Sequence, residues 1–142
     1  MNQYILDANI VFSALISKKE FYLDLMAQNT FYTPDFALIE INKYRSVILK
    51  KSRLKLDALN EYTFRFFRKL IVVPDYVISD NSLQKAIDLC ADIDLKDTIY
   101  IALAIELNTT LLTRDKPLYD GLIAKGFMPI QLFDDFIRQQ SN

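Results

Sequence analysis

The residues of this chain that are best suited to chemistry are four carboxylates: Asp7, Glu40, Asp97 and Asp115. Carboxylate oxygens are the ligands that Mg²⁺ and Mn²⁺ prefer in proteins. Several carboxylates in one crevice cannot all stay ionised near neutral pH without a cation, because like charges raise one another's pKa. A bound divalent ion removes that repulsion and lowers the pKa of its own water, which gives a hydroxide nucleophile without histidine. The four acids therefore predict hydrolysis by a metal-activated water, with one ion or two.

Other common catalytic groups are missing from the sequence. The 142 residues include no histidine, which excludes Ser-His and Cys-His nucleophiles and histidine-ligated zinc. The two glycines, Gly121 and Gly126, come late in the chain, which excludes a P-loop and a dinucleotide-binding fingerprint. The single cysteine, Cys90, excludes an internal disulfide and a thiolate zinc site. If the chain is an enzyme, the groups that remain available are carboxylates, Lys, Arg, Tyr, Ser and Thr, together with bound hard cations.

Short apolar segments alternate with helical segments along the whole chain. The predicted strands are 3–6, 31–33, 70–73, 110–113 and 129–132, and the predicted helices are 9–16, 19–27, 35–51, 55–69, 81–91, 97–108, 115–124 and a last one after residue 132. This alternation indicates an α/β fold of three α/β/α layers around a mainly parallel sheet of about five strands. Neither a linker nor an internal repeat interrupts it, so residues 1–142 are predicted to form a single domain.

The order of the strands decides whether the acids can meet. Asp7 follows the first predicted strand directly, and Asp115 lies just beyond the fourth. In open parallel sheets, ligands bind outside the carboxyl ends of the strands, where the strand order reverses. If the first and fourth strands are neighbours there, Asp7 and Asp115 face each other. Asp94 and Asp97, three residues apart, are expected on one side of the helix that begins near them.

Each acid also has a purely structural interpretation. Asp7, Asp94 and Asp115 stand where a helix N-cap would stand, and Asp is a good cap. Glu40 shares a predicted helix face with apolar residues, so we expect it either to be paired or to bind a ligand. A cap interpretation is attractive for any one of them, but so many acids at element ends together favour a metal site.

Three segments resemble the motifs of the PIN-domain nucleases, in the same order and spacing. They are YILDANIVFSAL at 4–15, DLKDTIYIALA at 94–104 and LLTRDK at 111–116, and EINKY at 40–44 resembles the helical acidic position of that family. The resemblance implies that Asp7, Glu40, Asp97 and Asp115 are the metal-binding set, for Mg²⁺ or Mn²⁺. It implies metal binding less directly for Asp94, which matches only some members. Asn9 and Thr113 match positions that support the site.

The resemblance also implies a role. Such domains cleave RNA, and compact prokaryotic members are often VapC-like toxins, which pair as homodimers and are blocked by a small antitoxin. The expectation is thus a metal-dependent endoribonuclease, with a housekeeping RNA-processing nuclease or a catalytically silent RNA-binding module as alternatives. A haloacid-dehalogenase-like phosphatase is disfavoured, because its second acid should stand at the position of Asn9.

Positive charge is concentrated in residues 43–69, called here the basic arm. The basic arm holds nine Lys and Arg against two acids, a net charge of +7, whereas the rest of the chain carries −8. A basic arm beside an acidic cleft suits an RNA backbone. We expect Lys50, Lys51, Arg53 and Lys55 to contact the RNA, and the alternative is that this basic face is only solvated. Tyr44, Tyr62 and Phe66 are candidate surfaces for stacked bases, and the alternative is that they belong to the core.

The sequence predicts no membrane segment. Its longest apolar run covers residues 99–105, which is far too short to span a bilayer. The first residues have neither the basic region nor the unbroken apolar stretch of a secretory signal. We therefore expect a cytoplasmic protein.

Overall fold

The computed structural model describes residues 2–51 and 56–140, and within them it contains a sheet of five parallel strands. The strands are β1 (Gln3–Leu6), β2 (Thr30–Pro34), β3 (Leu70–Val73), β4 (Thr110–Thr113) and β5 (Ile130–Leu132). Their spatial order is β3-β2-β1-β4-β5, and all four pairings are parallel. The predicted sheet is therefore confirmed, and the neighbours β1 and β4 flank the point where the strand order reverses.

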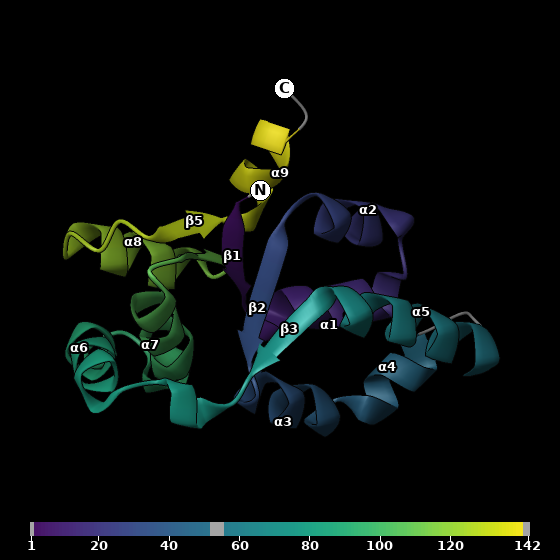
Figure 1. Cartoon of the computed structure of the whole chain (residues 1–142), viewed down its shortest axis with the longest axis horizontal. Helices are drawn as coiled ribbons and strands as arrows, with labels where there is room; N and C mark the ends of the chain where they lie inside the picture. Colours follow the sequence, from purple (N-terminus) through teal and green to yellow (C-terminus); the bar gives the residue numbers. More distant parts are fainter. Residues whose placement is uncertain (1, 52–55, 141–142) are drawn as a thin grey trace.

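Helices connect the strands and cover both faces of the sheet. They are α1 (Ala8–Ser17), α2 (Glu20–Gln28), α3 (Phe36–Lys43), α4 (Arg45–Lys51), α5 (Leu56–Lys69), α6 (Asp80–Cys90), α7 (Thr98–Leu107), α8 (Lys116–Ala124) and α9 (Phe133–Gln140), with short 3₁₀ helices η1 (Asp75–Val77) and η2 (Leu95–Asp97). Figure 1 shows α6, α7 and α8 on one side of the strands and α1, α2 and α5 on the other. The three-layer α/β/α prediction is confirmed.

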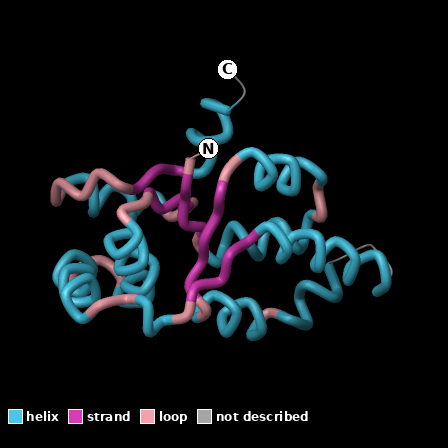
Figure 2. The backbone as a smooth tube through the Cα atoms, viewed as in Figure 1, coloured by secondary structure: helices cyan, strands magenta, loops and turns pink. Residues whose placement is uncertain are grey.

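Alternation along the strands produces two separate cores. On β1, Ile5 packs with the α6–α8 layer and Leu6 packs with the α1, α2 and α5 layer. Leu111 and Leu112 divide in the same way on β4, because successive side chains of a strand point to opposite faces. The central strands β1 and β4 therefore lie between the two layers of helices, an arrangement that the tube in Figure 2 also shows. Burial on both faces explains why Ile5-Leu6 and Leu111-Leu112 are adjacent apolar pairs rather than alternating with polar residues.

One predicted helix, 35–51, is two helices in the structure. The break is at Tyr44, whose backbone leaves the helical region (φ −105°, ψ 18°) and whose N–H donates to the carbonyl of Ile41 instead of continuing the α-helical pattern. Neither Gly nor Pro stands there, so local propensity does not cause the break. It accompanies tertiary packing, in which Ile48 of α4 enters the core while Tyr44 lies against Phe12.

None of the helices within the described ranges combines the length and the apolar character that a membrane crossing requires. The longest of them, α5, is strongly amphipathic rather than uniformly apolar.

Candidate active site

Asp7 occupies the carboxyl end of β1 at the reversal of the sheet. Its side chain is buried, with Oδ1 accepting the backbone N–H of Asn9 at 3.0 Å and Oδ2 accepting the hydroxyl of Thr113 at 3.0 Å. The first contact is a helix N-cap for α1, so the structural interpretation of Asp7 holds. Burial raises the pKa of Asp7, and Glu40 and Asp115 raise it further, while the two hydrogen bonds lower it.

Thr113 links Asp7 to Asp115 across the β1–β4 boundary. Its hydroxyl donates to Asp7 and accepts the backbone N–H of Asp115 at 3.0 Å. Asp115 Oδ1 in turn accepts the N–H of Leu118 at 3.0 Å and caps α8. The predicted meeting of the two acids depended on β1 and β4 being neighbours, and they are, with Leu6 opposite Leu112 in the register. Both carboxylates are thus held rigidly at one edge of the sheet.

Asp97 differs from these capping residues. Its side chain makes no capping bond, and Oδ2 is buried without a hydrogen-bond partner among the residues that the structure describes. Burial raises the pKa of Asp97 to about 7, and the negative charges of Asp7, Asp94, Asp115 and Glu40 add to the effect. A buried carboxylate oxygen without a hydrogen-bond partner is unfavourable, and either a proton or a bound cation would relieve it.

Asp94 is an exposed cap rather than a buried acid. Its Oδ1 accepts the backbone N–H of Lys96 at 2.9 Å and begins the 3₁₀ helix η2. The N-cap interpretation of Asp94 therefore holds, whereas Asp97 makes no capping bond. Asp94 still contributes negative charge to the surroundings of Asp97.

Glu40 reaches the acids from α3 and is held by a residue that the sequence analysis missed. The hydroxyl of Tyr100 donates to Glu40 Oε1 at 2.5 Å. Tyr100 is only 2% exposed and lies one helical turn after Asp97, so its ring is fixed by the core of α7. Burial, and then the bond to Glu40, raises the pKa of the tyrosine hydroxyl. The i,i+3 spacing from Asp97 is the signal that could have identified Tyr100.

The five carboxylates lie in one region, but the described side chains are not arranged as a preformed metal site. Across residues 2–51 and 56–140, no three acidic side chains lie close enough together to form a preorganised metal site. Asp7, Asp94 and Asp115 accept hydrogen bonds from backbone N–H groups, and Glu40 accepts one from the hydroxyl of Tyr100. The donor set is nevertheless the one that a hard divalent cation uses, and the unpartnered Asp97 oxygen fits such a cation. The residues that could hold it are these five acids.

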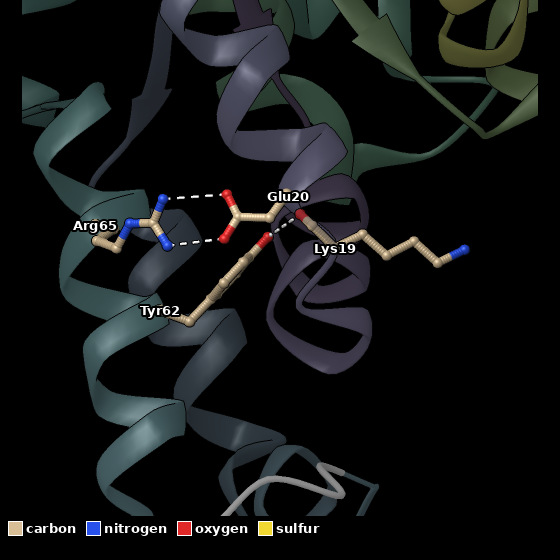
Figure 3. A network of polar contacts seen from close by, with 4 residues as sticks. All are labelled: Lys19, Glu20, Tyr62 and Arg65. Atoms are coloured by element: carbon tan, nitrogen blue, oxygen red, sulfur yellow. Dashed lines mark hydrogen bonds and ion pairs between the residues drawn. The ribbon is translucent and has the colours of Figure 1, made fainter.

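The basic arm is only partly described. Lys50 and Lys51 are exposed at the end of α4, while Arg53 and Lys55 lie outside the described residues. Figure 3 shows how α5 is tied to the rest of the domain: Arg65 forms two hydrogen bonds with Glu20, and the Tyr62 hydroxyl donates to the carbonyl of Lys19 at 2.9 Å. These contacts fix the direction of α5 relative to α2.

Two of the three aromatic residues suggested for stacking cannot serve. Tyr62 and Phe66 are buried in the core between α5 and the sheet, so that suggestion is wrong for them. Helical periodicity places both on one face of α5 but does not say what covers that face. Tyr44 is different, with 53% of its surface exposed. Asn9, predicted to support the site, uses its backbone N–H on Asp7 and leaves its side chain exposed.

Solved structures share this architecture. The chain is 20% identical to a chain of VapBC2 from Rickettsia felis, which was crystallised bound to a DNA fragment from the VapBC2 promoter. The TM-score is 0.60 over 92% of this chain and 96% of that one. It is 13% identical to PAE2754 from Pyrobaculum aerophilum, with a TM-score of 0.63 over 99% of this chain and 91% of that one. These likenesses show the fold. No curated protein sequence matches the chain.

The family model described as "PIN domain" matches residues 5–131, a span that contains the reversal point of the sheet and all five acids beside it. PIN domains are nucleases that generally depend on metal ions. The match extends over nearly the whole chain, and the chain therefore belongs to the PIN-domain family.

Proposed function

We propose that this PIN domain is an endoribonuclease that hydrolyses RNA phosphodiester bonds with Mg²⁺ or Mn²⁺. The carboxylates proposed to hold the metal are Asp7, Glu40, Asp94, Asp97 and Asp115. The observation that carries the proposal is the buried Asp97 oxygen, which has no hydrogen-bond partner among the described residues and is surrounded by the negative charge of the other four acids. A site with this much uncompensated charge gains most from a divalent cation.

The chain's own residues have distinct parts in this proposal. Asp7 and Asp115 are held by capping bonds and by Thr113, so they present oxygens at fixed positions. Asp97 contributes its unpartnered oxygen, and Tyr100 sets the orientation of Glu40. A divalent ion bound here supplies a water of lowered pKa as the nucleophile.

The direct test is cleavage of mixed RNA by the purified protein with Mg²⁺, Mn²⁺ or EDTA. We expect cleavage with either metal and none with EDTA, because no histidine is present to activate water. Asp97→Asn should abolish cleavage. Asp120→Asn is the matched control, since that exposed carboxylate on α8 forms its ion pair with Lys116, four residues before it, and the variant should cleave normally. Full activity in excess EDTA would contradict the metal mechanism.

RNA is proposed to run along the basic arm. Lys50 and Lys51 support this, because both are exposed and neither forms an ion pair with a described residue. Lys51→Gln should weaken RNA binding and reduce the slope of log K against log salt by about 0.7 if one phosphate contact is lost. Lys85→Gln, on the α6 side of the sheet, removes the same charge and should change neither. Equal effects of the two variants would show that the arm is only a solvated face.

The biological role proposed is that of the toxin in a toxin–antitoxin pair. Support comes from the family and from the shared fold with VapBC2, and the acid cluster suits an antitoxin that inserts a cationic side chain. Expression without a partner should arrest growth, and a small protein should co-purify from the native host. Harmless expression of a protein that cleaves RNA would favour a housekeeping nuclease, and RNA binding without cleavage would favour a silent module.

Self-association as a homodimer is proposed as well. Its support is an exposed apolar surface beside α3 and η2, where Ile39 and Leu95 line a 580 Å³ depression together with Leu83. Exposed apolar patches of this kind commonly mark protein interfaces. Ile39→Glu should convert a dimer into a monomer in sedimentation experiments without changing the circular dichroism. A wild-type monomer at all concentrations would refute the proposal.

A further inference from the structure

A small pocket opens beside Glu40, where helices α1 and α3 flank the acid cluster. It has a volume of 310 Å³ and is lined by Ala8, Asn9, Phe12, Glu40, Ile41 and Tyr44. Ala8 and Asn9 follow Asp7 directly in the chain, and Glu40 is itself one of the five acids. The pocket therefore adjoins the candidate active site through Glu40.

Two aromatic rings form one wall of this pocket. The rings of Phe12 and Tyr44 are 5.3 Å apart between centroids and tilted by 57°. Phe12 is partly buried against the core, whereas Tyr44 is 53% exposed. Tyr44 owes its place to the break between α3 and α4, which carries it out of the helix. An exposed ring supported from behind by a second ring is a stable stacking platform.

The polar groups of the pocket lie at its acidic end. The exposed Asn9 side chain offers both donors and an acceptor, and no described residue bonds the second oxygen of Glu40. The carboxylate would repel a phosphate group, which therefore has no place inside. A neutral, flat group with hydrogen-bonding edges is complementary to these walls. Ligand pockets in proteins begin at roughly 300 Å³, so the volume of this pocket suits one such group.

We propose that this pocket binds a single unpaired nucleobase of the RNA, next to the phosphate at the metal site, with the base stacked on Tyr44. The inference rests on the proposed function, since it names the part of the substrate that the same site selects. Unstacked bases bind to proteins chiefly by stacking on aromatic side chains and by hydrogen bonds to their edges. The pocket would make the enzyme select single-stranded over paired RNA.

The test is an abasic scan with single-stranded RNA oligonucleotides in EDTA, in which one base at a time is removed and binding is measured. For the wild type, one position should weaken binding by about 10-fold, the loss expected for one stacked base. Tyr44→Leu should weaken binding of the intact RNA by a similar factor and show no further loss at that position. Tyr44→Phe, which keeps the ring, should retain most of the affinity.

The matched control is Tyr76→Leu, because Tyr76 in η1 is 84% exposed and lies outside the pocket. It should bind intact and abasic RNA like the wild type. The inference is overturned if the wild type and Tyr44→Leu show the same abasic profile, or if the wild type binds no RNA. It is also overturned if arginine amide, used as a probe for a cationic protein side chain, binds at Tyr44 while single-stranded RNA does not. If Tyr44→Leu cleaves RNA and has the abasic profile of the wild type, the inference fails and the proposed function stands. If RNA binding depends on Tyr44 but no cleavage occurs, the proposed function fails and the inference stands.

Discussion

Asp97→Asn tests the crowding of the carboxylates without relying on activity. In the absence of divalent ions, burial and then the neighbouring charges raise the pKa of Asp97 from 3.8 to about 7. The folded protein therefore keeps a proton on Asp97 in a pH range where the unfolded chain has already lost it. Asparagine has a similar shape and stays neutral at every pH, so the variant removes the charge and little else.

The sign and size of the effect follow from this shift. Between pH 3.8 and about 7 the folded state binds more protons than the unfolded state, so the free energy of unfolding falls as the pH rises. The stabilising contribution is complete below pH 3.8, is lost as the pH passes 7, and is constant above that. At 1.36 kcal/mol for each pKa unit, the shift amounts to at most about 4 kcal/mol. Because solvent screens the exposed part of the side chain, we expect about 2 kcal/mol.

The assay is urea unfolding from pH 4 to pH 8 in EDTA, followed by circular dichroism. Asp97→Asn should match the wild type near pH 4 and be more stable by about 2 kcal/mol at pH 8. Mn²⁺ should then stabilise the wild type more than the variant, because the variant has lost a ligand. Asp120→Asn serves as control and should follow the wild type at each pH, since its carboxylate is exposed.

A parallel pH profile for wild type and Asp97→Asn would refute the reasoning, since Asp97 would then ionise as freely in the folded protein as in the unfolded chain. A variant less stable than the wild type at pH 8 would refute it as well. That result would mean that the carboxylate is a structural group with favourable partners, and the metal-site argument built on its unpartnered oxygen would fail.

Two substitutions, at Tyr100 and Thr113, test how the site is held, and a third, at Gly121, tests the packing of α8. Tyr100→Phe removes the hydrogen bond to the α3 carboxylate and should lower Mn²⁺ affinity about 10-fold in calorimetry; Tyr62→Phe also removes a buried hydroxyl bond and should leave that affinity unchanged. Thr113→Val removes the hydroxyl that joins β1 to the start of α8, and we expect a loss of about 2 kcal/mol in urea unfolding, because a buried carboxylate oxygen loses its donor. A neutral effect would show that water replaces the hydroxyl. Gly121→Ala should change stability by less than about 1 kcal/mol, because the helix-propensity gain offsets displacement of the Ile93 δ-methyl, which the new Cβ would meet at 2.8 Å. A large loss in thermal unfolding would mean that Ile93 cannot move.

Much of the fold was predictable because its signals are local. The central strands β1 and β4 each contain a short apolar run that is followed by a capping Asp, and burial on both faces favours such runs in a parallel sheet. Asp7 and Asp115 were predictable as neighbours because parallel strands place their carboxyl ends on one edge. The break at Tyr44 was not predictable, since no Gly or Pro marks it and the packing of Ile48 against distant residues accompanies it.

The types of the candidate site residues were determined by the sequence alone: acids at the ends of strands and helices, without histidine, favour chemistry on a carboxylate-bound cation. Their partners were decided only by the tertiary structure. Tyr100 reaches Glu40 across 60 positions and Thr113 reaches Asp7 across 106, and no local pattern carries information over such separations. Exposure was decided in the same way. Tyr44 and Tyr62 both lie in segments that the sequence predicts to be helical. Tyr62 is buried because α5 packs against the core, whereas Tyr44, at the break between α3 and α4, is open to solvent.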